Sequence, residues 1–209
     1  MIKAIGIDPS LSGTGLYYCE DFKDKSSLLI TTKKDSFKSK DELIIKNKAK
    51  KQTSLELVDR FKREYKIYKD VLTFLIINKP NIICIEGYAF MGSNLAVQAE
   101  VMGIIGLAIN KYLLNNKCDL FVITPQAVKK YITGKGSGKK QMIIKEVYKK
   151  YNIDIDNDNI ADAYVISQIA SDIKYIIKNK KFRNGMLSYE KEVFKGMFSL
   201  KDILKNIKQ

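Results

Sequence analysis

The sequence predicts an α/β protein with a mixed β-sheet that is antiparallel at its start and parallel afterwards. Short apolar runs alternate along the chain with longer segments of helical spacing. The first three apolar runs follow one another closely, as in a strand meander. The later runs are separated by helical segments, and strand–helix–strand order is typical of parallel pairing.

The expected strands are short and end at turn or charged residues. Residues 2–7 precede Asp8-Pro9, and the run Ile82–Glu86 ends in a carboxylate. Helices are expected where apolar residues recur every three or four positions. The other strands are expected at 16–19, 28–32 and 120–123, and the helices at 41–78, 94–116, 126–132, 139–151 and 159–178.

The length of 209 residues suits one domain with an appendage. We expect the domain at 1–179, with a helical insertion around 41–78, and a basic C-terminal extension at 180–209. No run of about 18 uncharged apolar residues occurs and the charged start does not resemble a signal peptide, so no membrane association is expected. Three unclustered cysteines indicate a reducing, cytoplasmic setting.

The absence of histidine excludes several classes of enzyme, and the net charge indicates the kind of partner. The chain has 37 basic and 23 acidic residues, a net charge of +14, and no histidine. Ser-His-Asp and Cys-His catalysis and histidine-ligated zinc are therefore excluded. The positive charge favours a polyanionic partner. It is uneven, because residues 129–150 hold eight lysines and one glutamate whereas residues 151–171 hold four aspartates and no basic residue.

Three carboxylates stand at the ends of expected elements. Asp8 ends the first strand, Glu86 ends a later strand, and Asp162 is expected in the first turn of the last helix of the core. Each alone is compatible with turn chemistry, a solvated strand end or the helix dipole. Together at one sheet edge they would repel one another unless a cation lay between them. Mg²⁺ or Mn²⁺ prefers such oxygen ligands, and two ions would suit phosphodiester cleavage.

The same residues resemble the motifs of RuvC-type Holliday-junction resolvases. Residues 5–15 (Ile-Gly-Ile-Asp-Pro-Ser-Leu-Ser-Gly-Thr-Gly) resemble the first motif, and residues 85–90 (Ile-Glu-Gly-Tyr-Ala-Phe) resemble the second. Residues 124–141 are similar to the basic DNA-contacting segment, and residues 159–163 (Asn-Ile-Ala-Asp-Ala) to the closing motif. The resemblance implies an RNase H-like fold, a homodimer, and magnesium-dependent cleavage of four-way DNA junctions in recombination and repair.

The resemblance also implies roles for single residues. Asp8, Glu86 and Asp162 correspond to the metal-binding catalytic acids of the family. The fourth acidic position, three residues before the final aspartate, holds Asn159, and Asp158 is one residue out of register. Either Asp158 or Asn159 can complete the metal site, with Asn159 offering an oxygen without charge.

The resemblance also implies basic and aromatic residues that contact DNA. Lys139 or Lys140 fills the position of the catalytic lysine of the family. Phe90, or else Tyr88, corresponds to the aromatic residue that stacks at the junction centre, and a core position for it is an equal alternative. The dense positive charge favours phosphate contacts by five lysines: Lys129, Lys130, Lys135, Lys139 and Lys140.

The motifs leave several functions open. A dimer of the resolvase would nick two strands symmetrically, with helix 94–116, rich in Ala and Gly, either at the dimer face or packed on the sheet. Other possibilities are a related nuclease acting on other branched or RNA-containing substrates, a non-catalytic nucleic-acid-binding relative, and an actin-like phosphotransferase. The Lys-, Ile- and Asn-rich composition indicates an AT-rich genome, and the divergent motifs favour a phage over a bacterium.

Overall fold

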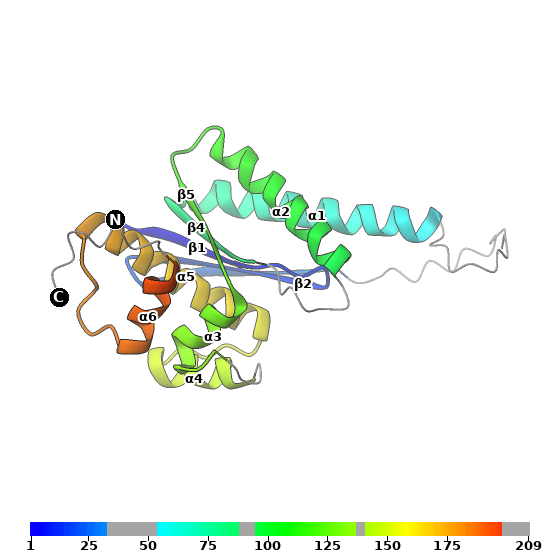
Figure 1. Ribbon diagram of the computed structural model, residues 1–209. Coiled ribbons are helices and arrows are strands. Elements are labelled where there is room, and N and C mark those ends of the chain that lie inside the picture. The colour runs from blue at the N-terminus through cyan, green and yellow to red at the C-terminus, as the bar shows by residue number, and fades with distance from the viewer. Residues whose placement is uncertain (33–53, 88–94, 137–140, 198–209) are drawn as a thin grey trace.

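The protein folds around one mixed sheet, seen in a computed structural model that describes residues 1–32, 54–87, 95–136 and 141–197 (Figure 1). In this part of the chain the strand order is β3-β2-β1-β4-β5. The pairs β1–β2 and β2–β3 are antiparallel, and β1–β4 and β4–β5 are parallel, which confirms the predicted mixed sheet. The strands are β1 (Lys3–Asp8), β2 (Gly13–Glu20), β3 (Lys23–Thr31), β4 (Ile82–Glu86) and β5 (Asp119–Ile123).

Helices cover both faces of the sheet (Figure 1). One face carries α1 (Ser54–Asn78) and α2 (Leu95–Leu113), which share a hydrophobic cluster with the odd-numbered residues of β1. The other face carries α5 directly on the sheet, with the remaining helices packed around it. These are α3 (Pro125–Thr133), α4 (Gln141–Tyr151), α5 (Asp158–Asn179) and α6 (Ser188–Met197). Among the described residues no helix is long and apolar enough to span a bilayer.

The strands near the start of the chain are longer than the apolar runs predicted. β2 ends at Glu20 and β3 begins at Lys23, so only Asp21 and Phe22 connect them. Both adopt positive φ angles of 48° and 66°, as two-residue hairpin turns require. Sequence reasoning missed this hairpin because the turn lacks the usual Asn-Gly or Asp-Gly signal. The predicted helix at 41–78 is described from Ser54 onward, and its first part lies outside the described residues.

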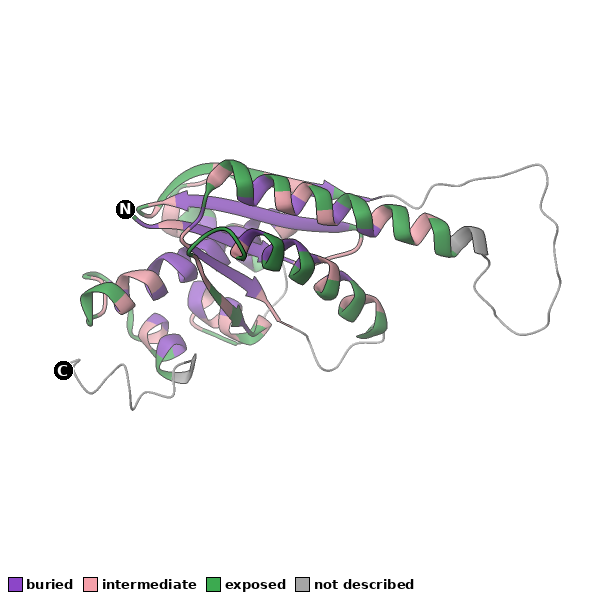
Figure 2. Ribbon diagram, turned by 90° about the horizontal axis from the view of Figure 1, so that it is seen from above, coloured by how far each residue is buried: buried purple, intermediate pink, exposed green. Residues whose placement is uncertain are grey.

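Helix α5 rests directly on the backbone of β1 and β2 because glycines lie beneath it. A Cβ atom added at Gly6 would lie 2.1 Å from the carbonyl oxygen of Ala163. One added at Gly15 would lie 2.2 Å from the carbonyl oxygen of Asn159. Both distances are far below any van der Waals contact, so these two positions fix how closely the helix approaches the sheet. Figure 2 shows the buried strands and α5 as the purple interior of the molecule.

The described part of the C-terminal segment packs into the same core as the rest of the chain. Met186, Val193 and Phe194 are buried in the cluster that contains α5. Arg183 donates from Nε to Oδ1 of the fully buried Asp172 at 2.8 Å. Residues 180–197 thus share the core of residues 1–179, and residues 198–209 lie outside the described part of the chain.

The Arg183–Asp172 pair ties this segment to α5, and we expect Arg183→Met to destabilise the protein by about 3–5 kcal/mol at neutral pH. Burial raises the pKa of Asp172, while Arg183 and a hydrogen bond from Tyr131 lower it. Without Arg183 the pKa of Asp172 rises further, so the folded state binds a proton more tightly than the unfolded state. The deficit therefore shrinks as the pH falls toward 4. Urea unfolding at pH 7 and pH 4 measures it, and an equal deficit at both would contradict this account.

Candidate active site

Two of the predicted acids lie side by side on neighbouring strands. Ile7 of β1 pairs with Ile85 of β4, so the next residues, Asp8 and Glu86, follow at adjacent carboxyl ends. Side chains alternate between the two faces along a strand. Ala4 and Cys84 belong to the cluster on the α5 face, so by alternation Asp8 and Glu86 also point to that face. Asp8 is buried, with 8% of its surface exposed.

Helix α5 brings the third acid to the same place. Gly15, the antiparallel partner of Asp8, lies beneath the carbonyl oxygen of Asn159. Asp162 follows one helical turn later and is buried, with 7% of its surface exposed. It is the fifth residue of α5 and therefore begins the second turn of the helix, whereas the sequence predicted it in the first turn. Asp8, Glu86 and the start of α5 thus meet at one end of one face of the sheet.

The two residues predicted for the fourth acidic position have different surroundings. Asp158 accepts a hydrogen bond at Oδ1 from the backbone N–H of Asn159 at 3.1 Å, within its own helix. Asn159 faces the sheet, because a Cβ added at Gly13 would lie 2.7 Å from its Nδ2 atom. Asn157 caps the helix by accepting from the N–H of Ile160. Asn159 therefore packs against β2 at the start of α5.

The donor set of this site suits a hard cation. Its side chains offer carboxylate oxygens and one amide oxygen, the ligands that Mg²⁺ and Mn²⁺ prefer. Gly13 and Gly15 let Asn159 approach β2 closely, because a Cβ atom added at either would lie 2.7 or 2.2 Å from an atom of Asn159. Among the described residues, however, no three acidic or cysteine side chains are grouped closely enough to hold a metal ion as they stand. The residue types fit a metal, while its binding stays a prediction.

Glu86 also adjoins the start of α3. The N–H of Gly87 donates to the carbonyl oxygen of Ile123 at 2.7 Å, which holds the end of β4 against the end of β5. Thr124 caps α3 by accepting from the N–H of Ala127 at 3.3 Å, and Pro125 occupies the first turn. The basic segment thus leaves the sheet beside the candidate acids.

The lysines predicted to contact DNA occupy α3 and the loop that follows it. Lys129 and Lys130 lie in the last part of α3, which ends at Gly134 in the left-handed conformation. Thr133 Oγ1 accepts from the N–H of Lys135 at 3.1 Å and donates to its carbonyl oxygen, which fixes the first loop residues. The remaining predicted contacts lie outside the described residues: Tyr88, Phe90, Lys139 and Lys140.

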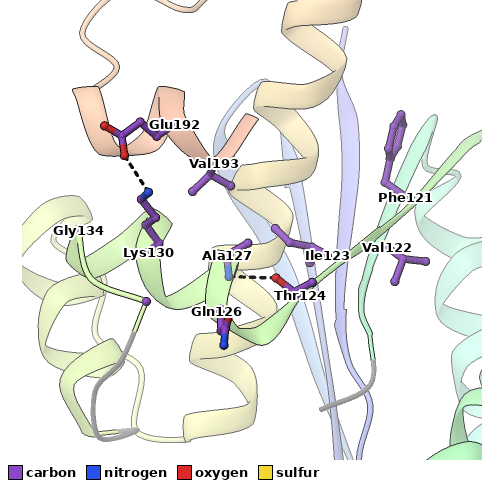
Figure 3. A pocket seen from close by; sticks show the side chains of 11 residues that line it. Phe121, Val122, Ile123, Thr124, Gln126, Ala127, Lys130, Gly134, Glu192 and Val193 are labelled. Carbon is purple, nitrogen blue, oxygen red and sulfur yellow. Dashed lines mark hydrogen bonds and ion pairs between the residues drawn. The ribbon is translucent and has the colours of Figure 1, made fainter. Parts of the chain in front are cut away.

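A groove of about 720 Å³ runs between β5, α3 and α6 (Figure 3). Ile123 and Thr124 line one part of it, beside the end of β4. Lys130 and Glu192 line another part, where their side chains form an ion pair at 2.7 Å. Sequence reasoning missed Glu192, because it belongs to no motif and pairs with a residue 62 positions earlier.

Comparison with known proteins gives the family. A sequence model of the family described as crossover junction endodeoxyribonuclease RuvC matches residues 4–170. A relative described as crossover junction endodeoxyribonuclease RuvC from Prochlorococcus marinus (strain MIT 9312) is 26% identical over 171 residues, covering 79% of this chain and 94% of the relative.

Two solved structures have a similar fold. One is T. thermophilus RuvC in complex with Holliday junction substrate, with a TM-score of 0.57, 17% identity, and coverage of 86% of this chain and 97% of that chain. The other is a Thermus thermophilus RuvC structure, with a TM-score of 0.56, 18% identity, and coverage of 85% and 97%. They confirm the predicted RNase H-like fold. On the family match over most of its length, the chain belongs to the crossover junction endodeoxyribonuclease RuvC family.

Proposed function

We propose that this protein resolves four-way DNA junctions by metal-dependent hydrolysis of phosphodiester bonds, with Asp8, Glu86 and Asp162 as its catalytic acids. The observation that carries the proposal is the convergence of these three residues from β1, β4 and α5 on one end of one sheet face. A family member with three acids at one end of the sheet has the residues that metal-dependent hydrolysis of a phosphodiester bond needs. One solved structure of similar fold is described as T. thermophilus RuvC in complex with Holliday junction substrate.

The metal site consists of Asp8, Glu86 and Asp162, with Asn159 at the fourth position. Asn159 is preferred to Asp158 because its side chain faces β2, with its amide group over Gly13 and its Cβ atom over Gly15, the partner of Asp8. Two Mg²⁺ or Mn²⁺ ions bound there would supply an activated water and stabilise charge on the leaving oxygen. Asp8 and Asp162 are buried, so they would hold such ions in a site partly shielded from bulk water.

The DNA surface consists of the basic segment that begins at the end of β5. Lys129 lies in α3 and Lys135 in the loop after it, on the segment that leaves the sheet at the end of β5. Lys139 or Lys140 acts as the catalytic lysine, and Phe90 or Tyr88 stacks at the junction centre. The three cysteines form no disulfide, as is usual in a reducing compartment. Together with a DNA substrate, this favours the cytoplasm of a bacterial or phage-infected cell.

A homodimer would supply the two active sites that paired nicks require. Helix α2 packs on the sheet through one face, which includes Val101, Ile105 and Ala108. Its Gly103 and Gly106 point outward, and a Cβ added at either would meet nothing within 4 Å. Leu107 beside them is 59% exposed. Packing on the sheet therefore leaves these small residues unexplained, and we assign them to the dimer face.

Gly103→Phe is expected to weaken dimerisation at least about tenfold, since a large side chain prevents close approach of two helices. The monomer has open space there, so its fold should be kept. Sedimentation over a range of protein concentrations measures the dissociation constant. Gly103→Ala is the matched control and should remain dimeric. A dimer that tolerates phenylalanine at this position would place the interface elsewhere.

Competition between DNA substrates tests the proposed function. Labelled four-way junction, bound without divalent metal, is challenged with unlabelled junction, three-way branch, RNA–DNA hybrid and plain duplex. A resolvase prefers the four-way junction over duplex by at least about 1,000-fold, the lower end for specific recognition. Equal affinity for junction and duplex would contradict it, and preference for another branched or hybrid DNA would identify the related nuclease instead.

A further inference from the structure

Helix α6 is held rigidly beside the DNA-contacting segment, and it lies entirely beyond the residues that match the family. Its inner face is buried through Phe194, whose ring packs edge-on against Tyr131 of α3 with centroids 6.0 Å apart. Glu190 is also buried, forms an ion pair with Lys150 of α4, and accepts from the N–H of Leu187 at 2.6 Å. These contacts fix α6 against both helices that flank the basic loop.

The outer face of α6 presents a carboxylate to one of the predicted DNA-binding lysines. Glu192 Oε2 lies 2.7 Å from Lys130 Nζ, as Figure 3 shows, and the two side chains are 57% and 37% exposed. The hydrogen bond and positive charge of Lys130 lower the pKa of Glu192, so the carboxylate is ionised at neutral pH. Lys130 therefore meets any approaching phosphate already paired with an anion.

The pair lines a groove that also includes the end of β5, next to the end of the strand that carries Glu86. The groove is lined by Ile123 and Thr124 at the end of β5, and Gly87, the residue after Glu86, is hydrogen-bonded to Ile123. An exposed ion pair of this kind contributes only about 0–1 kcal/mol to stability. The Lys130–Glu192 pair therefore matters more for the affinity of this surface for DNA than for the stability of the fold.

We propose that Glu192 competes with DNA phosphate for Lys130 and so lowers the affinity of this face for DNA. This inference rests on the proposed function in that the basic segment binds DNA. A lysine that stays paired with a carboxylate neutralises no phosphate, and the carboxylate itself repels the DNA backbone. Because phosphates are alike in every DNA, Glu192 weakens binding to junction and duplex by the same factor. It sets affinity without touching the reacting atoms.

Salt titration of DNA binding tests this role with Glu192→Gln. Without divalent metal, the logarithm of the binding constant is measured against the logarithm of salt concentration, for junction and for duplex. One further lysine–phosphate contact steepens the slope by about 0.9 and tightens binding about eightfold at 0.1 M salt. In a Lys130→Gln background, Glu192→Gln should leave the slope unchanged, since no lysine is released. In single-turnover cleavage, the rate at saturating enzyme should be kept. The enzyme concentration that gives half of this rate should fall.

Asp70→Asn is the matched control. Asp70 pairs with Lys66 at 2.5 Å on α1, on the opposite face of the sheet, so this variant changes the net charge equally and should keep the wild-type slope. Equal slopes for wild type and Glu192→Gln would overturn the inference, as would a steeper slope that persists without Lys130. Equal binding of wild type to junction and duplex would instead contradict the proposed function, and the duplex slopes would still decide the role of Glu192.

Discussion

Asp8→Asn should reduce cleavage of a four-way junction at least about 1,000-fold, a loss of about 4 kcal/mol of transition-state stabilisation. Asp8 lies at the end of β1, buried beside Glu86 and beneath the start of α5. Neutralising it removes a charge that the metal ions need and also relieves repulsion among the acids. Junction affinity measured without metal should therefore be unchanged or higher, and the melting temperature should not fall.

Asp156→Asn provides the control, because Asp156 is exposed in the loop before α5 and makes the same change in charge. It should retain cleavage. If Asp8→Asn cleaved at the wild-type rate, the acids would have no catalytic role. If neither the wild type nor Asp8→Asn cleaved the junction while both bound it, the protein would be a non-catalytic DNA-binding relative, which the asparagine at the fourth acidic position would explain.

Gly6→Ala should destabilise the fold by about 3 kcal/mol or more, the range of severe overpacking. The added Cβ would lie 2.1 Å from the carbonyl oxygen of Ala163 and 2.4 Å from the backbone nitrogen of Ser167. Both neighbours belong to the backbone of α5, so no side chain can turn away. Denaturant unfolding measures the loss.

Gly106→Ala is the opposite case on α2, where an added Cβ meets nothing within 4 Å. Replacing an unstrained helical glycine by alanine should leave stability unchanged or raise it by up to about 1 kcal/mol. If Gly6→Ala were as stable as Gly106→Ala, α5 would not rest on the sheet backbone as described. The position of Asp162 relative to Asp8 would then need revision.

The order of the strands and the positions of Asp8 and Glu86 at their ends could be predicted because local rules determine them. Asp8 and Glu86 follow short apolar runs, and parallel neighbours end at the same sheet edge. The approach of Asp162 is less local, since it depends on Gly6 and Gly15, whose role only the packed helix reveals. The sequence placed Asp162 at a helix start and the resemblance gave it a role, while the glycines of β1 and β2 explain how α5 comes close to the sheet.

The C-terminal segment could not be predicted from its own pattern. The apolar side chains of residues 180–197 have weak helical spacing, and the burial of Phe194 depends on Tyr131, a partner far away in the sequence. A glutamate such as Glu190 is expected at the surface. It is buried here because it forms an ion pair with Lys150. Pairings across tens of residues leave no periodic signal in the chain.

Mapping of nicks on a synthetic four-way junction is the most direct test of the account. Each of the four strands is end-labelled in turn and incubated with the protein, with and without Mg²⁺. We expect magnesium-dependent nicks at symmetric positions in two opposite strands near the branch point, and no such nicks in the plain duplex arms alone. Nicks that ignore the branch point, or an intact junction in the presence of Mg²⁺ and bound protein, would contradict the assignment of junction resolution to Asp8, Glu86 and Asp162.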